Sequence, residues 1–266
     1  MATRQAWAGC AAVLAAAVLL AAPGCGSEPE QAKELVLDLG GGVTMKLVLI
    51  PAGKFIMGSP DSELGRNEDE GPQHEVTISK PFYMGVTEVT QAQYEAVMGT
   101  NPSSFKGPTT PVEMVSWNDA AEFCKRLSPK TRQVVRLPTE AEWEYACRAG
   151  TETRFSFGDS DGVLGDHAWC ASNSGGKTQP VGQKTPNPWG LYDMHGNVWE
   201  WCADWYGDYT NGIVSNPSGP ASGTRRMLRG GSWSQGGAGA FRCASRRISD
   251  PSVRVNFYGF RCAKTP

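Results

Sequence analysis

The apolar positions in the first third of the chain recur with the short period of β-strands. Two apolar-rich runs, Leu35–Leu37 and Val43–Ile50, flank three glycines at positions 40–42. This pattern predicts a β-hairpin, because glycine tolerates the positive φ of a tight turn. Lys54–Met57 predicts a further short strand, and Glu75–Ser79 alternates between polar and apolar residues like another strand.

Two short helices are predicted from capping boxes, in which a hydroxyl residue and a Glu or Gln three positions later bond each other's backbone amides. Thr90 with Gln93 begins the first helix. Gly99 ends it about two turns later, since glycine is the common residue just after a helix. Thr139 with Glu142 begins the other helix.

A longer helix is predicted between these two. Ser116 caps its start, and we expect it to reach Leu127 and stop before Pro129, because proline has no amide proton to donate. After Gly150 the chain consists mostly of turns, and it contains 32 glycines and 18 prolines in all. Nine tryptophans supply the bulk of a core, so the pattern favours a loop-rich folded domain over a disordered chain.

Charge is unevenly spread along a chain whose net charge is only −2. Such a balance gives no long-range field towards nucleic acid or an acidic membrane surface, and we expect neither as a partner. The loop Gly58–Gln73 has five acidic side chains against one arginine, which is typical of a solvated face. The segment Arg225–Cys262 has eight arginines. We expect these to pair with carboxylates inside the protein; the alternative is that they bind an external anion.

The first 25 residues predict an export signal. Arg4 supplies a positive start, and the apolar run Ala6–Ala22 ends in the sequence Ala-Pro-Gly-Cys25. A cysteine in this place resembles the lipobox of bacterial lipoproteins. We therefore expect lipid attachment at Cys25, a linker over residues 26–34, and a membrane-anchored protein on the periplasmic or cell-surface side. The alternatives are an ordinary cleaved signal and an uncleaved anchor, for which the run is short, because a bilayer takes about 20 residues.

Six cysteines follow the export signal: Cys124, Cys147, Cys170, Cys202, Cys243 and Cys262. An even number in an exported chain favours disulfides, although many pairings are open. A zinc site is the alternative, since His167 precedes Cys170 by three residues and His195 precedes Cys202 by seven. No Cys-x-x-Cys pair occurs, which argues against zinc.

The stretch Gly190–Trp205 has the densest chemistry in the chain, with three tryptophans, a histidine, a cysteine and three carboxylates. Gly196 and Asn197 predict a tight turn between Asp193 and Glu200. Backbone carbonyls directed between two carboxylates suit a hard cation such as calcium. The alternative is a tryptophan-rich corner of the core whose carboxylates cap backbone amides.

Several motifs in order resemble the formylglycine-generating enzyme (sulfatase-modifying factor) family. They are Pro111-Val112 with Val115-Ser116-Trp117, RLPTEAEWEYA from Arg136, GLYDM from Gly190, GNVWEW from Gly196, RGGSW from Arg229 and GFR from Gly259. Together they span about residues 43–263. The resemblance implies a single α+β domain over residues 35–266. It also implies the formylglycine-generating-enzyme or C-type-lectin-like fold, which is loop-rich and low in regular secondary structure.

The resemblance further implies a structural calcium ion and a disulfide pattern. In the family, the segment that matches residues 193–200 binds calcium. The ligands here would be the side chains of Asp193 and Glu200 and the carbonyl oxygens of Gly196 and Val198. The disulfides would be Cys124–Cys262, Cys147–Cys243 and, as the remaining pair, Cys170–Cys202.

The chain departs from the family where the active enzymes bind copper. Those enzymes oxidise a sulfatase cysteine to formylglycine with copper held by two reactive cysteines, which follow the Gly-Gly-Ser-aromatic motif. Thiolates are the soft ligands that copper(I) prefers. Here residues 234–240 contain no cysteine and no histidine. We therefore expect no copper at this place, assign no catalytic residue, and predict a surface binding or accessory module. The alternative is a formylglycine-generating oxidase with an altered metal arrangement.

The binding face of such a module would be the surface where the active enzymes hold their substrate. The candidate residues there are Ser232, Trp233, Gln235, Arg242, Arg246, Asn256 and Tyr258. Aromatic rings would stack on a sugar or peptide, and arginines would bind an anion. We therefore expect a peptide, glycan or protein ligand at the cell surface. A related alternative is the lectin-like variable protein class, which shares this fold and varies in this segment.

Overall fold

Segments far apart in the sequence meet in three small β-sheets. The structure is a computed structural model that describes residues 1–2 and 32–265. Most of the predicted export signal, Cys25 and most of the linker lie outside the described residues. None of the described helices is long and apolar enough to cross a membrane.

The largest sheet joins the two ends of the domain. Its order is β1-β2-β5-β12-β6, with β1 (Glu34–Gly40), β2 (Val43–Ile50), β5 (Phe82–Gly85), β12 (Ala263–Lys264) and β6 (Val135–Arg136). The first two strands form the predicted hairpin, in which Leu37 lies opposite Met45 and the glycines at 40–42 all have positive φ. Because β12 lies between β5 and β6, the last strand of the chain is held inside the sheet.

The second sheet carries most of the residues discussed below. Its order is β10-β9-β7-β11, with β7 (Trp199–Trp205), β9 (Arg226–Arg229), β10 (Arg247–Ser249) and β11 (Tyr258–Gly259). Strand β11 runs parallel to β7, so that Tyr258 lies beside Trp199. The third sheet has the order β3-β4-β8, with β3 (Gly53–Met57), β4 (His74–Ile78) and β8 (Val214–Ser215). Both short strands predicted after the hairpin are therefore present.

The helices begin at the capping residues that the sequence predicts. They are α1 (Gln91–Met98), α2 (Trp117–Thr131), α3 (Glu140–Arg148) and α4 (Leu164–His167), together with the 3-10 turns η1 (Glu68–Glu70), η2 (Asp161–Val163) and η3 (Ala238–Phe241). The hydroxyls of Thr90, Ser116 and Thr139 each accept the amide proton of the residue three positions later. Gly99 ends α1 with a φ of 77°. The three predicted helix starts are confirmed.

The predicted end of the second helix before Pro129 is wrong, because α2 continues to Thr131. Proline removes one backbone hydrogen bond from a helix. Two hydroxyls add bonds to carbonyls of the same turns: Ser128 donates to the Cys124 oxygen at 2.8 Å, and Thr131 donates to the Leu127 oxygen at 3.0 Å. Side-chain donors thus compensate for the missing backbone donor close to the helix end.

The strands predicted in the C-terminal segment are displaced by a few residues. In place of a strand over residues 229–233, β9 ends at Arg229, and Gly230 and Gly231 turn the chain with φ of 100° and 79°. In place of a strand over Gly259–Cys262, the pairing is divided between β11 and β12. The close approach expected at glycine is confirmed, since a Cβ on Gly231 would lie 2.7 Å from a phenyl ring carbon.

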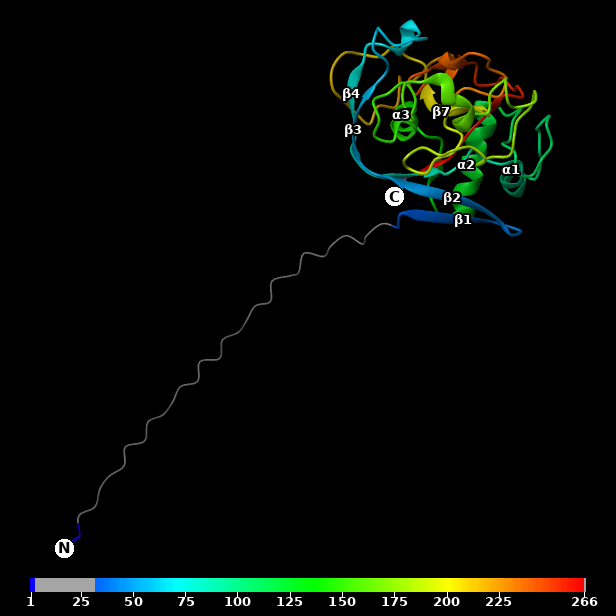
Figure 1. The fold of residues 1–266 in the computed structure, drawn as a ribbon. Helices are drawn as coiled ribbons and strands as arrows, with labels where there is room; N and C mark the ends of the chain where they lie inside the picture. The colour runs from blue at the N-terminus through cyan, green and yellow to red at the C-terminus, as the bar shows by residue number, and fades with distance from the viewer. Residues whose placement is uncertain (3–31, 266) are drawn as a thin grey trace. The chain divides into compact units, whose positions relative to one another are not determined.

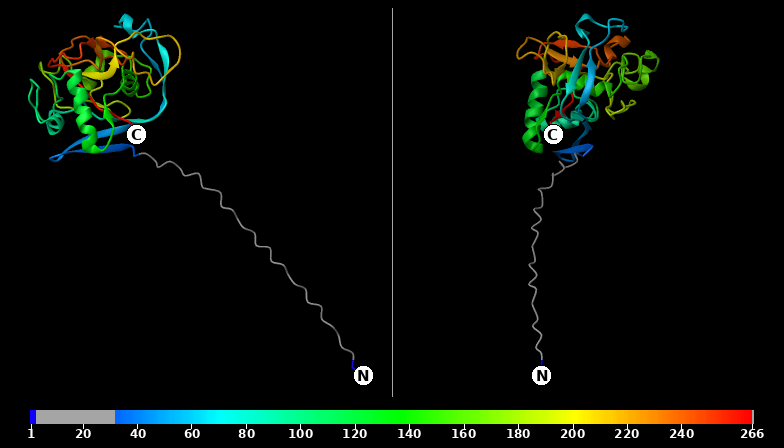
Figure 2. Two further views of the ribbon diagram at one scale, coloured as in Figure 1. Left: turned by 180° about the vertical axis from the view of Figure 1, so that it is seen from behind. Right: turned by 90° about the vertical axis from the view of Figure 1, so that its left-hand side faces the viewer.

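Three hydrophobic clusters fill the described part of the domain. The first packs α1 and α2 against the large sheet and includes Phe123 and Phe260. The second surrounds Trp143 of α3, and the third is a small cluster around Phe155. Figures 1 and 2 show α1 and α2 on the side away from β3 and β4, and in every view the loop between β3 and β4 lies next to the C-terminal segment. That contact builds the site described next.

Candidate functional site

A groove lies between the loop that joins β3 to β4 and the C-terminal segment. Its volume is about 370 Å³. The residues that line it are Gly65, Asn67, Trp199, Gln235, Gly237, Gly239, Ala240, Ser245, Arg246 and Arg247. Four of them belong to residues 234–240, so the segment after the Gly-Gly-Ser-Trp motif forms one wall. Neither cysteine nor histidine is among the lining residues.

The guanidinium of Arg247 is held at this groove by aromatic rings. Its Nε donates a hydrogen bond to the hydroxyl of Tyr258 at 2.8 Å. Its central carbon lies 5.6 Å, 5.7 Å and 5.5 Å from the ring centroids of Trp199, Phe257 and Tyr258, within the range of cation–π attraction. Among the described residues, no hydrogen-bond acceptor is found for its two terminal nitrogens. These nitrogens are therefore available to an anionic ligand.

Four of the seven residues predicted for the binding face are buried: Ser232, Arg242, Arg246 and Tyr258. Their prediction as free ligand-binding groups is wrong, because their polar atoms are bonded inside the protein, although Arg246 still borders the groove. The Ser232 hydroxyl lies 3.0 Å from the Ser234 hydroxyl. The Tyr258 hydroxyl accepts from Arg247 and so positions that side chain.

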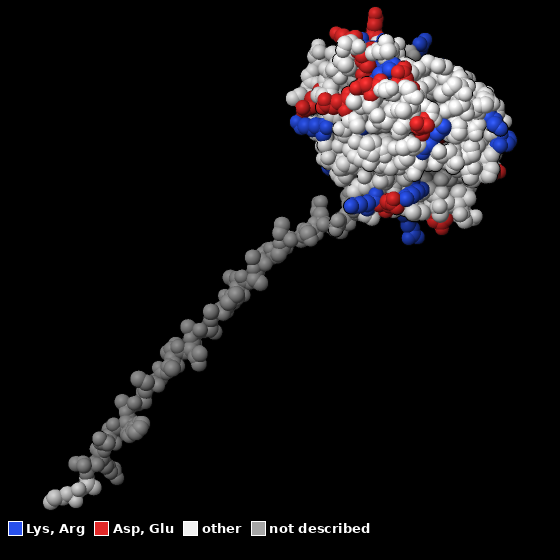
Figure 3. All heavy atoms as spheres, viewed as in Figure 1, with Lys and Arg blue, Asp and Glu red and all other residues white. Residues whose placement is uncertain are grey.

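Arg242 and Arg246 are paired with carboxylates, as we expect for the arginines of the C-terminal segment. Arg242 donates to the two oxygens of Glu70 at 2.6 Å and 2.5 Å. Arg246 donates to the two oxygens of Glu140 at 2.8 Å and 3.0 Å. The predicted internal pairing is confirmed. The prediction that the acidic loop is a solvated face is wrong for Glu70, because Glu70 is completely buried. Figure 3 shows exposed acidic side chains gathered at the end of the domain that carries β3 and β4.

The other three predicted residues are partly exposed at or near the groove. Gln235 lines it. The Trp233 indole donates to the Asn256 carbonyl oxygen at 2.9 Å, and its ring meets Phe105 edge-on at 5.5 Å. Trp233 and Asn256 are therefore held to one another, and of these three residues Gln235 is the one that lines the groove.

Sequence reasoning missed Arg247 and Trp199. Arg247 directly follows Arg246, and neighbouring side chains in an extended chain point to opposite faces. This alternation indicates that only one of the two arginines is buried, but it does not say which. In the sequence, Trp199 stood out only as part of the motif GNVWEW, which gave no sign that it lines a groove. Its place beside Tyr258 depends on the parallel pairing of β11 with β7.

The turn at Gly196 and Asn197 has the predicted positive φ angles, 154° and 63°. A Cβ on Gly196 would lie 2.5 Å from the Trp169 carbonyl oxygen, so only glycine fits. The Asn197 carbonyl accepts the amide proton of Trp233 at 2.9 Å. This turn therefore supports the start of the groove wall.

The predicted calcium ligands lie in a buried group of carboxylates around this turn. Glu200 accepts from the Arg261 guanidinium with both oxygens at 2.6 Å and from the Trp143 indole at 2.8 Å. Asp193 accepts the Gly182 amide proton with one oxygen at 2.7 Å. Its other oxygen is buried and has no partner among the described residues. That oxygen is the atom available to a cation.

Glu88 is a third carboxylate of the group, and no sequence motif pointed to it. It accepts the Val198 amide proton at 3.1 Å and a side-chain amide proton of Asn197 at 3.0 Å. Burial raises the pKa of Glu88 well above its usual range, and the charges of Asp193 and Glu200 raise it further. Burial likewise raises the pKa of Asp193 to about 6. Three carboxylates beside one arginine leave an excess of negative charge, which is the chemistry that suits a hard cation. Their oxygens do not all lie within 4.8 Å of one another in the described residues, so the side chains would have to move to coordinate an ion.

The six cysteines of the described part are buried thiols. In two predicted pairs the sulfurs are close, at 3.9 Å for Cys124 and Cys262 and at 3.6 Å for Cys147 and Cys243. They are not joined, so these two disulfides stay predictions. The pairing of Cys170 with Cys202 is wrong, because the two belong to different hydrophobic clusters and do not contact each other.

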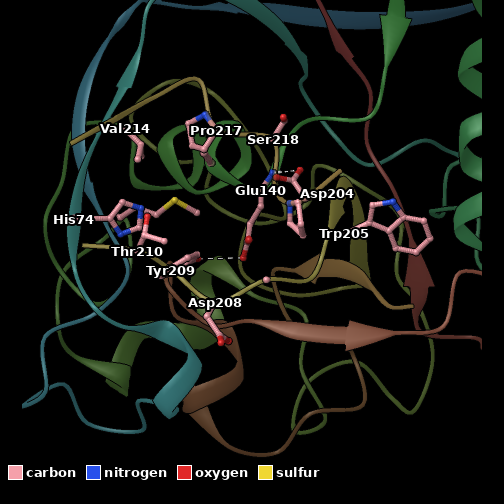
Figure 4. A pocket seen from close by; sticks show the side chains of 15 residues that line it. His74, Glu140, Asp204, Trp205, Asp208, Tyr209, Thr210, Val214, Pro217 and Ser218 are labelled. Carbon is pink, nitrogen blue, oxygen red and sulfur yellow. Dashed lines mark hydrogen bonds between the residues drawn. The ribbon is translucent and has the colours of Figure 1, made fainter. Parts of the chain in front are cut away.

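A second cleft, of about 470 Å³, opens between β7 and the loop after it. In Figure 4, His74 and Trp205 lie on opposite sides of the view, with Glu140 and Asp204 between them. Asp204 accepts the Glu140 amide proton at 2.8 Å, and Tyr209 donates to the Glu140 carboxylate at 3.2 Å. Burial, and then the charge of Glu140, raise the pKa of Asp204 to about 8. Asp204 is therefore a protonated acid at neutral pH.

Comparison with known proteins finds clear relatives. Residues 41–266 match the family model described as "Sulfatase-modifying factor enzyme 1-like domain". The chain is 33% identical to the formylglycine-generating enzyme of Mus musculus over 285 residues, covering 82% of this chain and 74% of that protein. It is 34% identical to the chaperone protein LppX of Paenibacillus barcinonensis, covering 72% and 79%. The solved structure of Treponema denticola variable protein 1 matches with a TM-score of 0.81 at 34% identity, covering 89% of this chain and all of that one.

Proposed function

Because the chain belongs to the sulfatase-modifying factor family, we propose that it uses the family scaffold as an exported surface binding or accessory module. The predicted α+β, C-type-lectin-like fold is confirmed by the same similarities. The proposal rests on the composition of the groove. The segment 234–240 contributes glycine, alanine and glutamine to its wall, where the active enzymes of the family have two reactive cysteines.

Copper-dependent oxidation at this groove would need thiols that a substrate can reach. No cysteine lines it, and all six cysteines of the described residues are buried. Burial raises the pKa of the Cys147 and Cys202 thiols well above the usual range, and the hydrogen bond with Cys124, together with burial, does the same for Cys262. A raised pKa disfavours the reactive thiolate. These features argue for binding and against oxidation of a substrate cysteine.

The groove offers the guanidinium of Arg247, the indole of Trp199 and neutral hydrogen-bonding groups, while Arg246, which also lines it, is paired with Glu140. Arg247 supplies two guanidinium nitrogens that have no acceptor in the part of the chain that the structure describes. Asn67, Gln235 and Ser245 line the same space. A guanidinium binds carboxylate, sulfate or phosphate oxygens in a bidentate manner. The ligand that fits is an acidic peptide or acidic glycan presented by a surface partner.

The names of two relatives favour the same class of function. One relative is a chaperone protein, and the other is a variable protein. Within this proposal a calcium ion at Asp193 stabilises the turn that supports the groove wall. Lipid attachment at Cys25 keeps the module at the membrane.

The decisive experiment tests the oxidase alternative directly. The reduced full chain is loaded with copper(I) and incubated in air with a cysteine-containing sulfatase peptide, and an active formylglycine-generating enzyme serves as the positive control. We expect the peptide to stay unchanged by mass spectrometry, while the control converts its cysteine to formylglycine. Conversion by this chain would overturn the proposal. Copper binding alone is not a sufficient readout, because it does not say where the metal is bound.

A further inference from the structure

The cleft of about 470 Å³ beside β7 has no part in the proposed function. Its volume is typical of a ligand pocket, for which about 300–1,000 Å³ is common. Met57, the last residue of β3, and His74, the first residue of β4, line it together with Trp205 and the loop Pro217–Pro220. The cleft shares no lining residue with the groove that Arg247 lines, so the two are separate sites.

Asp204 presents one carboxyl oxygen to this cleft. Its Oδ2 accepts the Glu140 amide proton at 2.8 Å, whereas no donor for Oδ1 is found among the described residues. Oδ1 is directed towards Gly219, which also lines the cleft, since a Cβ on that glycine would lie 3.4 Å from it. Asp204 is only 4% exposed. A buried acceptor without a donor is costly, so a donor from a ligand would be the missing partner.

His74 supplies a second acceptor. The residue is 8% exposed and lines the same cleft. Its Nδ1 lies 3.0 Å from the Pro72 carbonyl oxygen, which can only accept, so Nδ1 carries the proton. In the neutral ring the lone pair is therefore on Nε2, and no donor to Nε2 is found in the part of the chain that the structure describes. The cleft thus offers acceptors and requires donors from its ligand.

The lining of the cleft carries carboxyl groups and, among the described residues, neither lysine nor arginine. Glu140 uses both of its oxygens for Arg246, so Asp204 and Asp208 remain for a ligand. The acidic loop Gly58–Gln73 joins the two strand ends that line the cleft. Figure 3 shows exposed acidic side chains at this end of the domain. Such a surface attracts cations and repels anions.

The arrangement of the acceptors favours an ammonium over a guanidinium. A guanidinium binds best to both oxygens of one carboxylate. Inside the cleft Asp204 offers one oxygen and Glu140 offers none. An ammonium has three donors that can reach separate single acceptors. Met57 and Val214 also line the cleft, and they would contact the methylene groups that carry the ammonium.

We propose that this cleft binds a primary ammonium group on an alkyl chain, with Asp204 as its counter-ion and His74 Nε2 as a second acceptor. A lysine side chain of a partner protein and a free alkylamine present this same chemistry. The site does not rest on the proposed function of the groove.

Binding exchanges the proton of Asp204 for the ammonium, so affinity rises as Asp204 ionises. Glu140 and Glu142 on α3 are the charges that act on Asp204, and His74 on β4 and Asp208 in the loop line the same cleft. The ammonium itself stays charged up to about pH 10. We therefore expect the affinity to increase between about pH 6.5 and about pH 8.5.

The test titrates the full chain at about pH 8.5 with two probes, n-pentylamine and the capped peptide acetyl-Gly-Lys-Gly-amide, followed by NMR. The same peptide acetylated on the lysine nitrogen is the neutral control. It should bind about 10- to 100-fold more weakly, because it lacks the charged hydrogen bonds. Binding of the peptide alone would indicate a protein partner, and binding of both probes a general ammonium site. Binding of neither probe, or equal binding of the acetylated peptide, would overturn the proposal.

Three variants locate the site. Asp204→Asn still accepts the Glu140 amide proton but has no charge, so it should bind the ammonium about 10- to 100-fold more weakly and lose most of the pH dependence. A purely structural role of Asp204 would not change the pH dependence. Asp250→Asn, exposed and outside the lining, and Arg247→Gln, in the groove, should both bind like the wild type. Equal affinities of Asp204→Asn and the wild type would exclude Asp204 as the counter-ion.

Discussion

Arg247 donates to the hydroxyl of Tyr258 across 2.8 Å, and this bond fixes the direction of the one guanidinium that we assign to ligand binding. Tyr258 is buried, so its hydroxyl acts as a support for Arg247 and not as a ligand contact. The neighbouring arginines 242 and 246 are consumed by internal ion pairs. Arg247, held by Tyr258, is therefore the arginine that we assign to ligand binding, whereas Arg242 and Arg246 have a structural role.

Arg247→Gln should weaken recognition of an anionic ligand while the fold is kept. The probe is a panel of acidic and neutral peptides and of acidic and neutral glycans, screened on the immobilised chain. A hydrogen bond to a charged group contributes about 1.5–3 kcal/mol, so the best acidic binder should lose about 10- to 100-fold in affinity. Arg254→Gln is the matched control, because Arg254 is exposed and paired with Asp119 away from the groove lining. Unchanged affinity in Arg247→Gln, or a panel in which only neutral members bind, would contradict the assignment.

Arg242→Met should destabilise the protein strongly, because Glu70 would be left as an unpaired buried carboxylate. Breaking a buried ion pair by removing one partner costs about 3–5 kcal/mol. Arg126→Met removes an arginine from an exposed, solvent-screened pair with Glu122 and should cost much less. Urea unfolding followed by tryptophan fluorescence measures both. Similar losses in the two variants would show that Arg242 is not the internal support described here.

Asp193→Asn should remove the response of thermal stability to a calcium chelator. The wild-type chain is expected to melt at a lower temperature after chelation, because the carboxylates around Asp193 then lack their counter-ion. Glu200→Ala is a poorer test, since it also leaves Arg261 buried without its partner. Asp250→Asn, at an exposed position, should keep the full chelator response. A response in Asp193→Asn equal to that of the wild type would exclude this calcium site.

Asp204→Asn should gain stability relative to the wild type as the pH rises. In the folded protein the pKa of Asp204 is about 8, against about 3.9 for an unfolded chain. Between these values only the folded state keeps the proton, so the group lowers wild-type stability as the pH increases from about 4 to about 8. Asparagine cannot ionise and still accepts the Glu140 amide proton.

The difference in unfolding free energy between Asp204→Asn and the wild type should therefore grow by a few kcal/mol over this range. Urea unfolding at both ends of the pH range checks it. Asp208→Asn, in the same cleft but exposed, should change stability by less than about 0.5 kcal/mol at either pH. A constant difference for Asp204→Asn would indicate that Asp204 is ionised in the folded protein at neutral pH.

Local features of the fold could be predicted because they depend on neighbours in sequence. The capping boxes at Thr90 and Thr139 are closed by side chains three residues away. The hairpin at residues 40–42 needs only glycine and two apolar-rich flanks. Family motifs predicted the fold class. The end of α2 was missed because the bonds around Pro129 come from hydroxyls whose rotamers the pattern does not specify.

The candidate site was predicted only in outline. The sequence singled out residues 234–240, four of which line the groove, and it indicated that arginines of the segment Arg225–Cys262 pair with acidic residues. It assigned ligand binding to Arg242 and Arg246, and the structure leaves that role to Arg247. The zinc alternative that the sequence argued against joined His195 to Cys202 by their spacing, whereas the fold brings His195 next to Cys147. In each case the sequence indicated which types of residue interact, but it did not identify the interacting partners.

The sequence by itself determined the helix starts, the hairpin, the family and the absence of cysteine from residues 234–240. All of these are set by residue identity or by interactions within a few positions. Only the tertiary structure decided which arginine is free, which cysteines are neighbours and where His195 points. Arg242 and Glu70 are 172 residues apart, and Cys147 and Cys243 are 96 apart. Such partners are selected by the packing of whole segments, because burial makes an unpaired charge or polar group costly wherever its partner lies in the chain.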